Sequence, residues 1–492
     1  MVRNYMAMTT PIRRLGEKFA DWAMRYMPDP YVFVIVLTAL AFLAALPLQL
    51  QSGDVSTTLG AVTSIFDAWY GGVWTFLTFM AQFAVILMTG DAIAKSPAVT
   101  RLLERIAGVP RSRAQAVAFT SFVAMVGALI SWGLGLIVGA VMARQVTYQA
   151  QKRGTKLHYP LVAAAGYTGL MIWHSGLTSS SGLFMASLTE EDTEFLQYAP
   201  NGIPVTETIG SLANLTTVAL LLLVIPVVMA ALHPRDDDEI RGLPDSVVEE
   251  MTPSDGVAAD GGTATADPVE PTATERLSPA DRLNGSVGLT LLIAIFPAYY
   301  FVNSWFLSGD GLAGLSLNSI NAFFLFCAIV LWKTPEGIVE QMEDSVENVS
   351  GILFQFPFYA GISGIVTGTA LGLTIADFFA SVSTPLTWPV LGLISTGLVN
   401  FLVPSGGGQW AAQGPILLET TQQLGMPAST AVILEMMGDQ LTNMIQPFWA
   451  LPLLALADLR ARDIIGYSTV AMLVGFVIMA TTLTVFLGLP HA

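Results

Sequence analysis

The chain has 492 residues, of which 53% are hydrophobic and 12% are charged, and its formal net charge is −16. Soluble domains carry about a quarter charged residues, so this composition excludes an ordinary soluble protein and predicts an all-α integral membrane protein. The acidic balance excludes a nucleic-acid-binding surface, which needs the opposite sign. A single cysteine excludes an intrachain disulfide.

Long apolar stretches recur along the whole chain. A helix needs about 20 apolar residues to cross about 30 Å of hydrocarbon. We predict about nine transmembrane helices, near residues 31–50, 72–94, 160–186, 209–232, 286–307, 317–332, 349–370, 430–458 and 464–488.

All 21 Lys and Arg residues lie outside these stretches, and one consistent threading places all of them on one side. The positive-inside rule makes that side cytoplasmic. It predicts a multi-pass protein of the cell membrane with a cytoplasmic N-terminal segment, residues 1–30, and an external C-terminus. The alternative of eleven full crossings would strand the basic cluster at residues 144–156 outside.

Two further apolar stretches are predicted to be re-entrant hairpins. Residues 116–143 lie between two basic loops, so both ends face the cytoplasm. Residues 389–418 contain the sequence Pro404-Ser405-Gly406-Gly407-Gly408. It would cost a straight helix about 3 kcal/mol for the proline and about 1 for each glycine. Because the flanks of this stretch lack Lys and Arg, the second hairpin enters from the outside.

The two halves of the chain resemble each other at an offset of about 272 residues. We predict a first membrane repeat at residues 31–232 and a second at residues 285–488, joined by an acidic, disordered cytoplasmic linker at residues 233–284. The threading gives the two repeats opposite orientations. Inverted-topology repeats are typical of secondary transporters, whose binding site lies near the midplane where broken helices meet.

The predicted hairpin tips favour a small anion. A helix that restarts after a break directs free N–H groups and about half a positive charge at the gap, and consecutive glycines allow close approach to the backbone. The threading leaves no Lys or Arg within the bilayer, so an anion crossing there would have to be held by backbone dipoles, small polar side chains or a co-bound cation. The candidate substrate-binding residues are Ser131, Gly133, Gly135, His174, Ser405, Gly406, Gly407, Gly408, Asn443 and Gln446.

Asp439 is the main candidate for coupling transport to a cation, because a carboxylate at membrane depth is functional by default. With Asn400 it could bind Na⁺, or it could carry a proton; the alternative is a structural acid. Glu435, one helical turn earlier, is interpreted as structural. His174 is the only histidine within a predicted span, and it is either a satisfied core residue or a donor and proton relay.

At these residues the chain resembles the short-chain fatty acid transporter family, within a superfamily of hairpin-containing carriers. The matching stretches are Trp132–Ala140, Gln355–Ile362, Asn400–Trp410, Gln413–Pro415 and Asn443–Pro452. The resemblance implies uptake of acids such as acetoacetate or butyrate with a cation. By analogy with superfamily relatives it also implies a homodimer. The family pattern has Asn at Ser131, a glycine-rich run around His174 and Glu at Asp439.

The sequence therefore predicts a cation-coupled secondary transporter of small monocarboxylates and not an enzyme. One alternative is a carrier or exchanger for another small organic anion. Others are a channel and an intramembrane hydrolase that uses Ser405 and His174, although the chain lacks the G-x-S-x-G motif of such hydrolases. No cofactor is predicted, and the partners are a small carboxylate and the bilayer. The chain also lacks a phosphate-binding G-x-x-x-x-G-K-[ST] loop, so ATP does not drive it.

Overall fold

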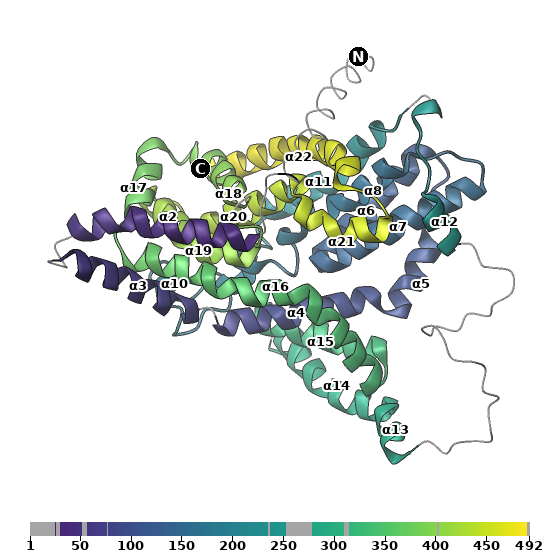
Figure 1. The fold of residues 1–492 in the computed structure, drawn as a ribbon, viewed down its shortest axis with the longest axis horizontal. Coiled ribbons are helices and arrows are strands. Elements are labelled where there is room, and N and C mark those ends of the chain that lie inside the picture. The colour runs from purple at the N-terminus through teal and green to yellow at the C-terminus, as the bar shows by residue number, and fades with distance from the viewer. Residues whose placement is uncertain are drawn as a thin grey trace.

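The computed structural model describes residue 25 and residues 30–51, 57–75, 77–234, 237–251, 278–308, 314–400 and 403–489. Every regular element in these ranges is a helix (Figure 1). The predicted N-terminal segment 1–30 lies almost entirely outside the described residues, as does the linker part 252–277.

Within the described ranges, six helices are long and apolar enough to cross a membrane, or seven if one bent pair counts as a single span. The chain is thus an all-helical membrane protein. The six are α2 (Pro30–Gln51), α3 with α4 (Thr58–Thr75 and Leu77–Lys95), α6 (Arg113–Ile130), α11 (Leu212–Ala231), α14 with η5 (Val287–Val302 and Asn303–Leu307), and α22 with η8 (Ala461–Leu483 and Thr484–Gly488). Four of them coincide with predicted spans, α3 with α4 begins at Thr58, well before the predicted span 72–94, and α6 falls in the predicted first hairpin.

The remaining predicted spans do not form long straight apolar helices. The span predicted at 317–332 is α15 (Leu317–Trp332), which has only 16 residues. The span predicted at 349–370 is the second half of α16 (Pro335–Gly368), which meets α17 (Leu371–Val382) at an angle of 75°. By helix length and composition alone, the described residues therefore contain fewer candidate membrane spans than the nine predicted.

Two of the predicted spans are broken in the middle. Residues 160–186 form α8 (Tyr159–Tyr167), η1 (Thr168–Met171), η2 (Trp173–Ser175) and α9 (Ser180–Met185). Residues 430–458 form α20 (Ala428–Thr442), η7 (Asn443–Ile445) and α21 (Pro447–Ala457). Pro447 lacks the N–H that a continuous helix would need, so α21 begins there as a new helix.

The predicted hairpin stretches also contain helix breaks. The first break is at Ser131, whose backbone is extended (φ −156°, ψ 137°) between α6 and α7 (Trp132–Lys152). The second lies between α18 (Trp388–Asn400) and α19 (Gly406–Gln423). The two helices at the first break have 18 and 21 residues, so together they extend beyond the predicted hairpin 116–143 into its polar flanks.

The start of the predicted disordered linker is ordered. Residues 237–251 contain η4 (Asp237–Glu239) and α12 (Asp245–Met251). Asp237 pairs with Arg113 at 2.7 Å, and Arg241 pairs with Asp463 at 2.9 Å. This part of the predicted linker is helical and makes ion pairs with residues elsewhere in the chain, which composition alone does not reveal.

A glycine-lined crossing joins the two halves of the chain at α3 and α16, which lie side by side in Figure 1. A methyl group at Gly72 would lie 2.5 Å from the Ala360 carbonyl oxygen and 2.8 Å from the Gly364 Cα atom. One at Gly364 would lie 2.2 Å from the Ala68 carbonyl oxygen. The two backbones are therefore in direct contact, and no side chain fits between them.

We expect Gly72→Ala to destabilise the protein by about 1–3 kcal/mol, because the added methyl meets backbone that has no space to move. Gly71→Ala is the matched control, since a methyl group at this neighbouring position meets nothing within 4 Å. The measurement is thermal unfolding of both variants in detergent. Equal melting temperatures for the two variants would contradict the close crossing.

Candidate functional site

The N-terminus of α19 presents backbone N–H donors of the first helical turn. Ser405 precedes the helix, and its hydroxyl accepts a hydrogen bond from the Gly408 N–H at 3.3 Å. The N–H groups of Gly406 and Gly407 have no acceptor within the helix, as in the first turn of any α-helix. This end of α19 is buried among side chains, so its partial positive charge acts in a low-dielectric environment.

The glycines at this terminus are required by close packing. A methyl group at Gly406 would lie 2.7 Å from Cε1 of His174, and one at Gly407 would lie 2.9 Å from Cε2 of Phe356. At Gly408 the nearest atom would be Cδ2 of Tyr359, at 2.9 Å. Aromatic rings therefore pack directly against the start of α19.

A small cavity of about 20 Å³ adjoins this terminus, and it is lined by Phe83, Trp132, Leu170, Trp173, Ser405, Gly406, Asn443 and Trp449. The lining joins the start of α7 to the start of α19, and the rings of Trp132 and Trp449 lie 5.2 Å apart. A volume of this size accommodates about one water molecule. The cavity is therefore too small for an organic acid in this conformation.

A buried acid cluster lies beside the same terminus. His174 Nδ1 is 3.1 Å from Asp439 Oδ2, and His174 Nε2 is 3.8 Å from Glu435 Oε2. One ligand atom from each of the three residues lies within 4.8 Å of the others, close enough to share one bound cation. All three side chains are buried.

An amide network fixes the broken part of the 430–458 segment. Asn400 Nδ2 donates to the Asp439 carbonyl at 2.7 Å and to Asn443 Oδ1 at 3.0 Å, and Gln446 Nε2 donates to the Asn400 carbonyl at 2.7 Å. The Tyr167 hydroxyl donates to the Asn443 carbonyl at 2.6 Å. Asn400 therefore contacts the backbone of Asp439, while the Asp439 carboxylate points to His174.

The residues predicted at the first break lie at the start of α7. A methyl group at Gly135 would lie 2.4 Å from the Ala128 Cβ, whereas one at Gly133 would meet nothing within 4 Å. The cavity lining includes the neighbouring Trp132 but neither Ser131 nor Gly133.

The apolar walls of the cavity were missed by the search for polar groups. They include Trp132, Trp173 and Trp449, each directly beside a residue or motif that the sequence analysis singled out. The position of these tryptophans beside the predicted helix breaks was the signal from which the sequence could have identified them.

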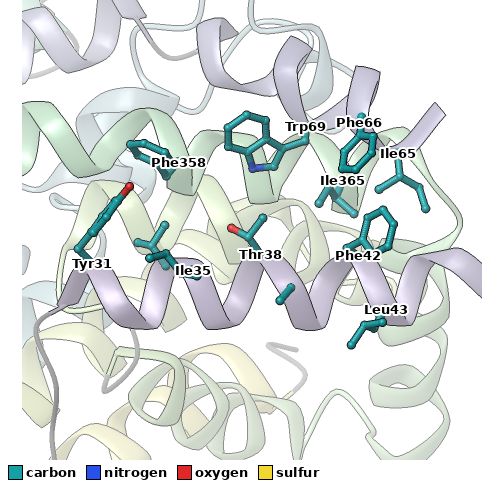
Figure 2. Close-up of a pocket in the computed structure, with 12 residues that line it drawn as sticks. Tyr31, Ile35, Thr38, Phe42, Leu43, Ile65, Phe66, Trp69, Phe358 and Ile365 are labelled. Carbon is teal, nitrogen blue, oxygen red and sulfur yellow. The ribbon is translucent and has the colours of Figure 1, made fainter. Parts of the chain in front are cut away.

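A second, larger cavity has a different character. About 560 Å³ in volume, it lies between α2, α3 and α16 and is lined by apolar and aromatic side chains that include Ile35, Phe66 and Trp69 (Figure 2). Thr38 and Tyr31 supply its hydroxyl groups. The residues that line this cavity carry no charged side chain, so it is less suited to binding a carboxylate.

Glu194, on the short helix α10 (Thr193–Leu196), contacts the end of α16. It accepts hydrogen bonds from the Thr367 hydroxyl at 2.9 Å and the Ser363 hydroxyl at 3.3 Å. Burial raises the pKa of Glu194 to about 7. A raised pKa means that the folded state favours the protonated acid, so the stability it contributes is full below about pH 4.5 and is lost as the pH rises through about 7.

We expect the melting temperature of the protein to fall between pH 6 and pH 8, and Glu194→Gln to reduce that fall. The stability lost over this interval is about 1 kcal/mol, because most of the linkage from a pKa of about 7 falls below pH 6 and solvent screens part of it. Melting curves at both pH values in detergent provide the measurement, with Glu191→Gln, an exposed acid of the same loop, as the control. An identical pH dependence in native protein and Glu194→Gln would contradict this assignment.

Comparison with known proteins gives the family. Residues 11–486 match the model of a family described as short chain fatty acid transporter. The chain belongs to the short-chain fatty acid transporter family. It is 33% identical over 475 residues to a relative from Escherichia coli (strain K12), covering 96% of this chain and 100% of the relative. With a relative from Haemophilus influenzae it shares 30% identity, over 94% of this chain and 97% of the relative.

A solved structure has a similar fold. The Alcanivorax borkumensis YdaH transporter, described as having an unusual topology, superposes with a TM-score of 0.59 at 16% identity, over 94% of this chain and 98% of that one. At this identity the likeness concerns the fold alone. Family membership makes this chain a membrane transporter and not an enzyme, as the sequence predicted.

Proposed function

We propose that this family member is a cation-coupled secondary transporter that binds the carboxylate of a short-chain fatty acid at the N-terminus of α19. The observation that supports this most strongly is the buried start of α19, where glycine N–H groups adjoin a cavity lined by apolar and aromatic side chains. Backbone donors suit the carboxylate, and the aromatic walls suit a short alkyl chain. The cavity has to become larger for the acid to bind in it.

In this proposal Ser405, Gly406, Gly407 and Gly408 hold the carboxylate, with His174 beside them. Asn443 contributes to the wall, and Gln446 fixes the backbone of the break through Asn400. Ser131, Gly133 and Gly135 form the opposite tip, where Trp132 reaches the cavity. Asp439 and Asn400 couple binding to a cation.

The proposed architecture is an inverted repeat with two re-entrant hairpins, one opening to the cytoplasm and one to the outside. Helix boundaries at the 272-residue offset support it. The pair α6 and α7, residues 113–152, corresponds to α18 and α19, residues 388–423. Likewise α8 with η1, residues 159–171, corresponds to α20 with η7, residues 428–445.

The orientation follows from charge. We propose a cell-membrane protein with a cytoplasmic N-terminus, a cytoplasmic linker and an external C-terminus, because the basic residues then share the cytoplasmic side. Exposed apolar side chains on α14, among them Phe296 at 68% exposure, face lipid or a second subunit in the proposed homodimer.

The test is uptake of butyrate and acetoacetate by proteoliposomes under imposed sodium or pH gradients. Because undissociated acid crosses lipid unaided, the uptake of protein-free vesicles is subtracted. We expect saturable, gradient-driven accumulation of both acids, with each acid inhibiting uptake of the other. Linear, non-saturable flux would favour a channel, and accumulation of a different organic anion with no response to either acid would contradict the proposal.

A further inference from the structure

Glu435 belongs to the buried acid cluster, and the proposed function assigns it no role. It lies on α20, one helical turn before Asp439, and its side chain is fully buried. Neither carboxyl oxygen has a well-formed hydrogen bond with a described residue, although the Ser181 hydroxyl faces it. An ionised carboxylate in such a place costs several kcal/mol, and a bound proton removes that cost.

His174 connects Glu435 to Asp439. Its Nδ1 lies 3.1 Å from Asp439 Oδ2, and its Nε2 lies 3.8 Å from Glu435 Oε2. The same Nε2 accepts a hydrogen bond from the Ser181 N–H at 3.4 Å, so the imidazole has Asp439 at one nitrogen and Ser181 with Glu435 at the other. Such a ring can accept a proton on one side and release another on the other side.

Among the described residues, the elements packed against α20 supply no buried positive charge to balance two carboxylates, because Arg462 on α22 is exposed. The elements packed against α20 are α9, α18, α19, α22, η1, η2 and η7. Apart from His174, their titratable side chains are Glu419 on α19 and Arg462, Asp463 and Tyr467 on α22. Glu419 accepts a hydrogen bond from Tyr198, and Asp463 from Arg241, so both acids have partners outside the cluster.

The composition of the cluster favours a proton over a metal ion. Hard cations such as Ca²⁺ and Mg²⁺ are held by six or more oxygens, and by the same reasoning Na⁺ prefers oxygen ligands. The group central to this cluster is an imidazole. A transition metal would suit imidazole, but Nδ1 of His174 already lies at hydrogen-bond distance from Asp439, at 3.1 Å.

We propose that the coupling ion is a proton and that Glu435 carries it, exchanging it with Asp439 through His174. This deepens the proposed function and rests on it. The Glu435 proton passes to Nε2 of His174 while the proton on Nδ1 passes to the Asp439 carboxylate, so the imidazole changes tautomer and charge is conserved. The gap of 3.8 Å at Glu435 has to close by about 1 Å during transfer.

The same imidazole touches the proposed substrate site. A methyl group at Gly406 would lie 2.7 Å from Cε1 of His174 and 3.1 Å from the Ser180 hydroxyl. The His174 ring therefore lies between the proposed proton site in the cluster and the proposed carboxylate site at the start of α19. A proton in the cluster favours the nearby anion, and the anion favours the proton, which is the reciprocity that symport requires.

The experiment compares native protein with Glu435→Gln in proteoliposomes loaded for acetoacetate transport, with protein-free vesicles subtracted. Native protein is expected to accumulate acetoacetate in response to a pH gradient, with no response to a sodium gradient at equal pH and no loss after EDTA. In Glu435→Gln we expect pH-driven accumulation to fall at least tenfold. Exchange of labelled for unlabelled acetoacetate at equal pH should persist, because exchange needs no net proton movement.

Glu340→Gln, an exposed acid on α16, is the matched control and should behave like native protein. Sodium-driven accumulation by native protein, or its loss after EDTA, would overturn the proton assignment while leaving the transport function intact. Normal pH-driven accumulation by Glu435→Gln would overturn the role of Glu435. If that variant does not fold, a pH-sensitive dye inside vesicles with native protein still decides whether the coupling ion is a proton. Symport requires about one proton to enter with each acetoacetate.

Discussion

Gly407→Val is expected to abolish butyrate uptake while the protein still folds. A methyl group at this position already lies 2.9 Å from Phe356 and 3.0 Å from Phe79, so the larger side chain has to displace the start of α19 or both rings. Misplacing a binding group by about 1 Å costs about 100-fold in rate. We therefore expect at least a 100-fold loss of initial uptake rate above protein-free vesicles.

Gly71→Val provides the control, because its Cβ meets nothing within 4 Å. Gel filtration and melting curves have to show that both variants are folded. Normal uptake by a folded Gly407→Val protein would remove the start of α19 from the substrate site.

Asp439→Asn is expected to collapse gradient-driven accumulation. The substitution keeps the shape of the side chain but removes the carboxylate that lies 3.1 Å from His174 Nδ1. Hydrogen bonds to charged groups contribute about 1.5–3 kcal/mol, which corresponds to a loss of tenfold or more in coupled transport. The measurement is the steady-state ratio of internal to external butyrate under a gradient.

Asp67→Asn, at an exposed acid on α3, is the matched control and should retain the native ratio. Undiminished uphill uptake by Asp439→Asn would rule out the coupling role of Asp439. Equal losses in the two variants would show that the assay reports expression or folding and not coupling.

The sequence predicted the helix breaks because their causes are local. Pro404 cannot continue the helix before it, and α19 begins at Gly406, directly after Ser405, with the three glycines as its first turn. This conclusion depends on neighbours in the sequence, which a single chain displays.

The grouping of side chains across the chain could not be predicted in the same way. His174 and Asp439 are 265 positions apart, and only the packing of η2 and α9 against α20 brings Glu435 to the second nitrogen of the imidazole. From sequence alone Glu435 was interpreted as structural, because periodicity places it on a helix face but does not reveal what that face meets.

The ordered part of the linker shows the same limitation. Asp237 and Arg241 belong to a stretch whose composition indicates disorder, yet they pair with Arg113 and Asp463. Composition describes the average tendency of a segment, whereas these ion pairs depend on where two distant basic and acidic groups happen to lie in the fold.

The central claim is that peptide N–H groups at the start of α19 receive the carboxylate of the substrate. It is tested most directly by solid-state NMR dipolar dephasing between the ¹³C-labelled carboxyl carbon of bound butyrate and ¹⁵N-labelled glycine amides. We predict strong dephasing that corresponds to about 4 Å, since an N–H···O hydrogen bond spans about 2.9 Å. Bound butyrate without any dephasing by glycine nitrogen would contradict the account.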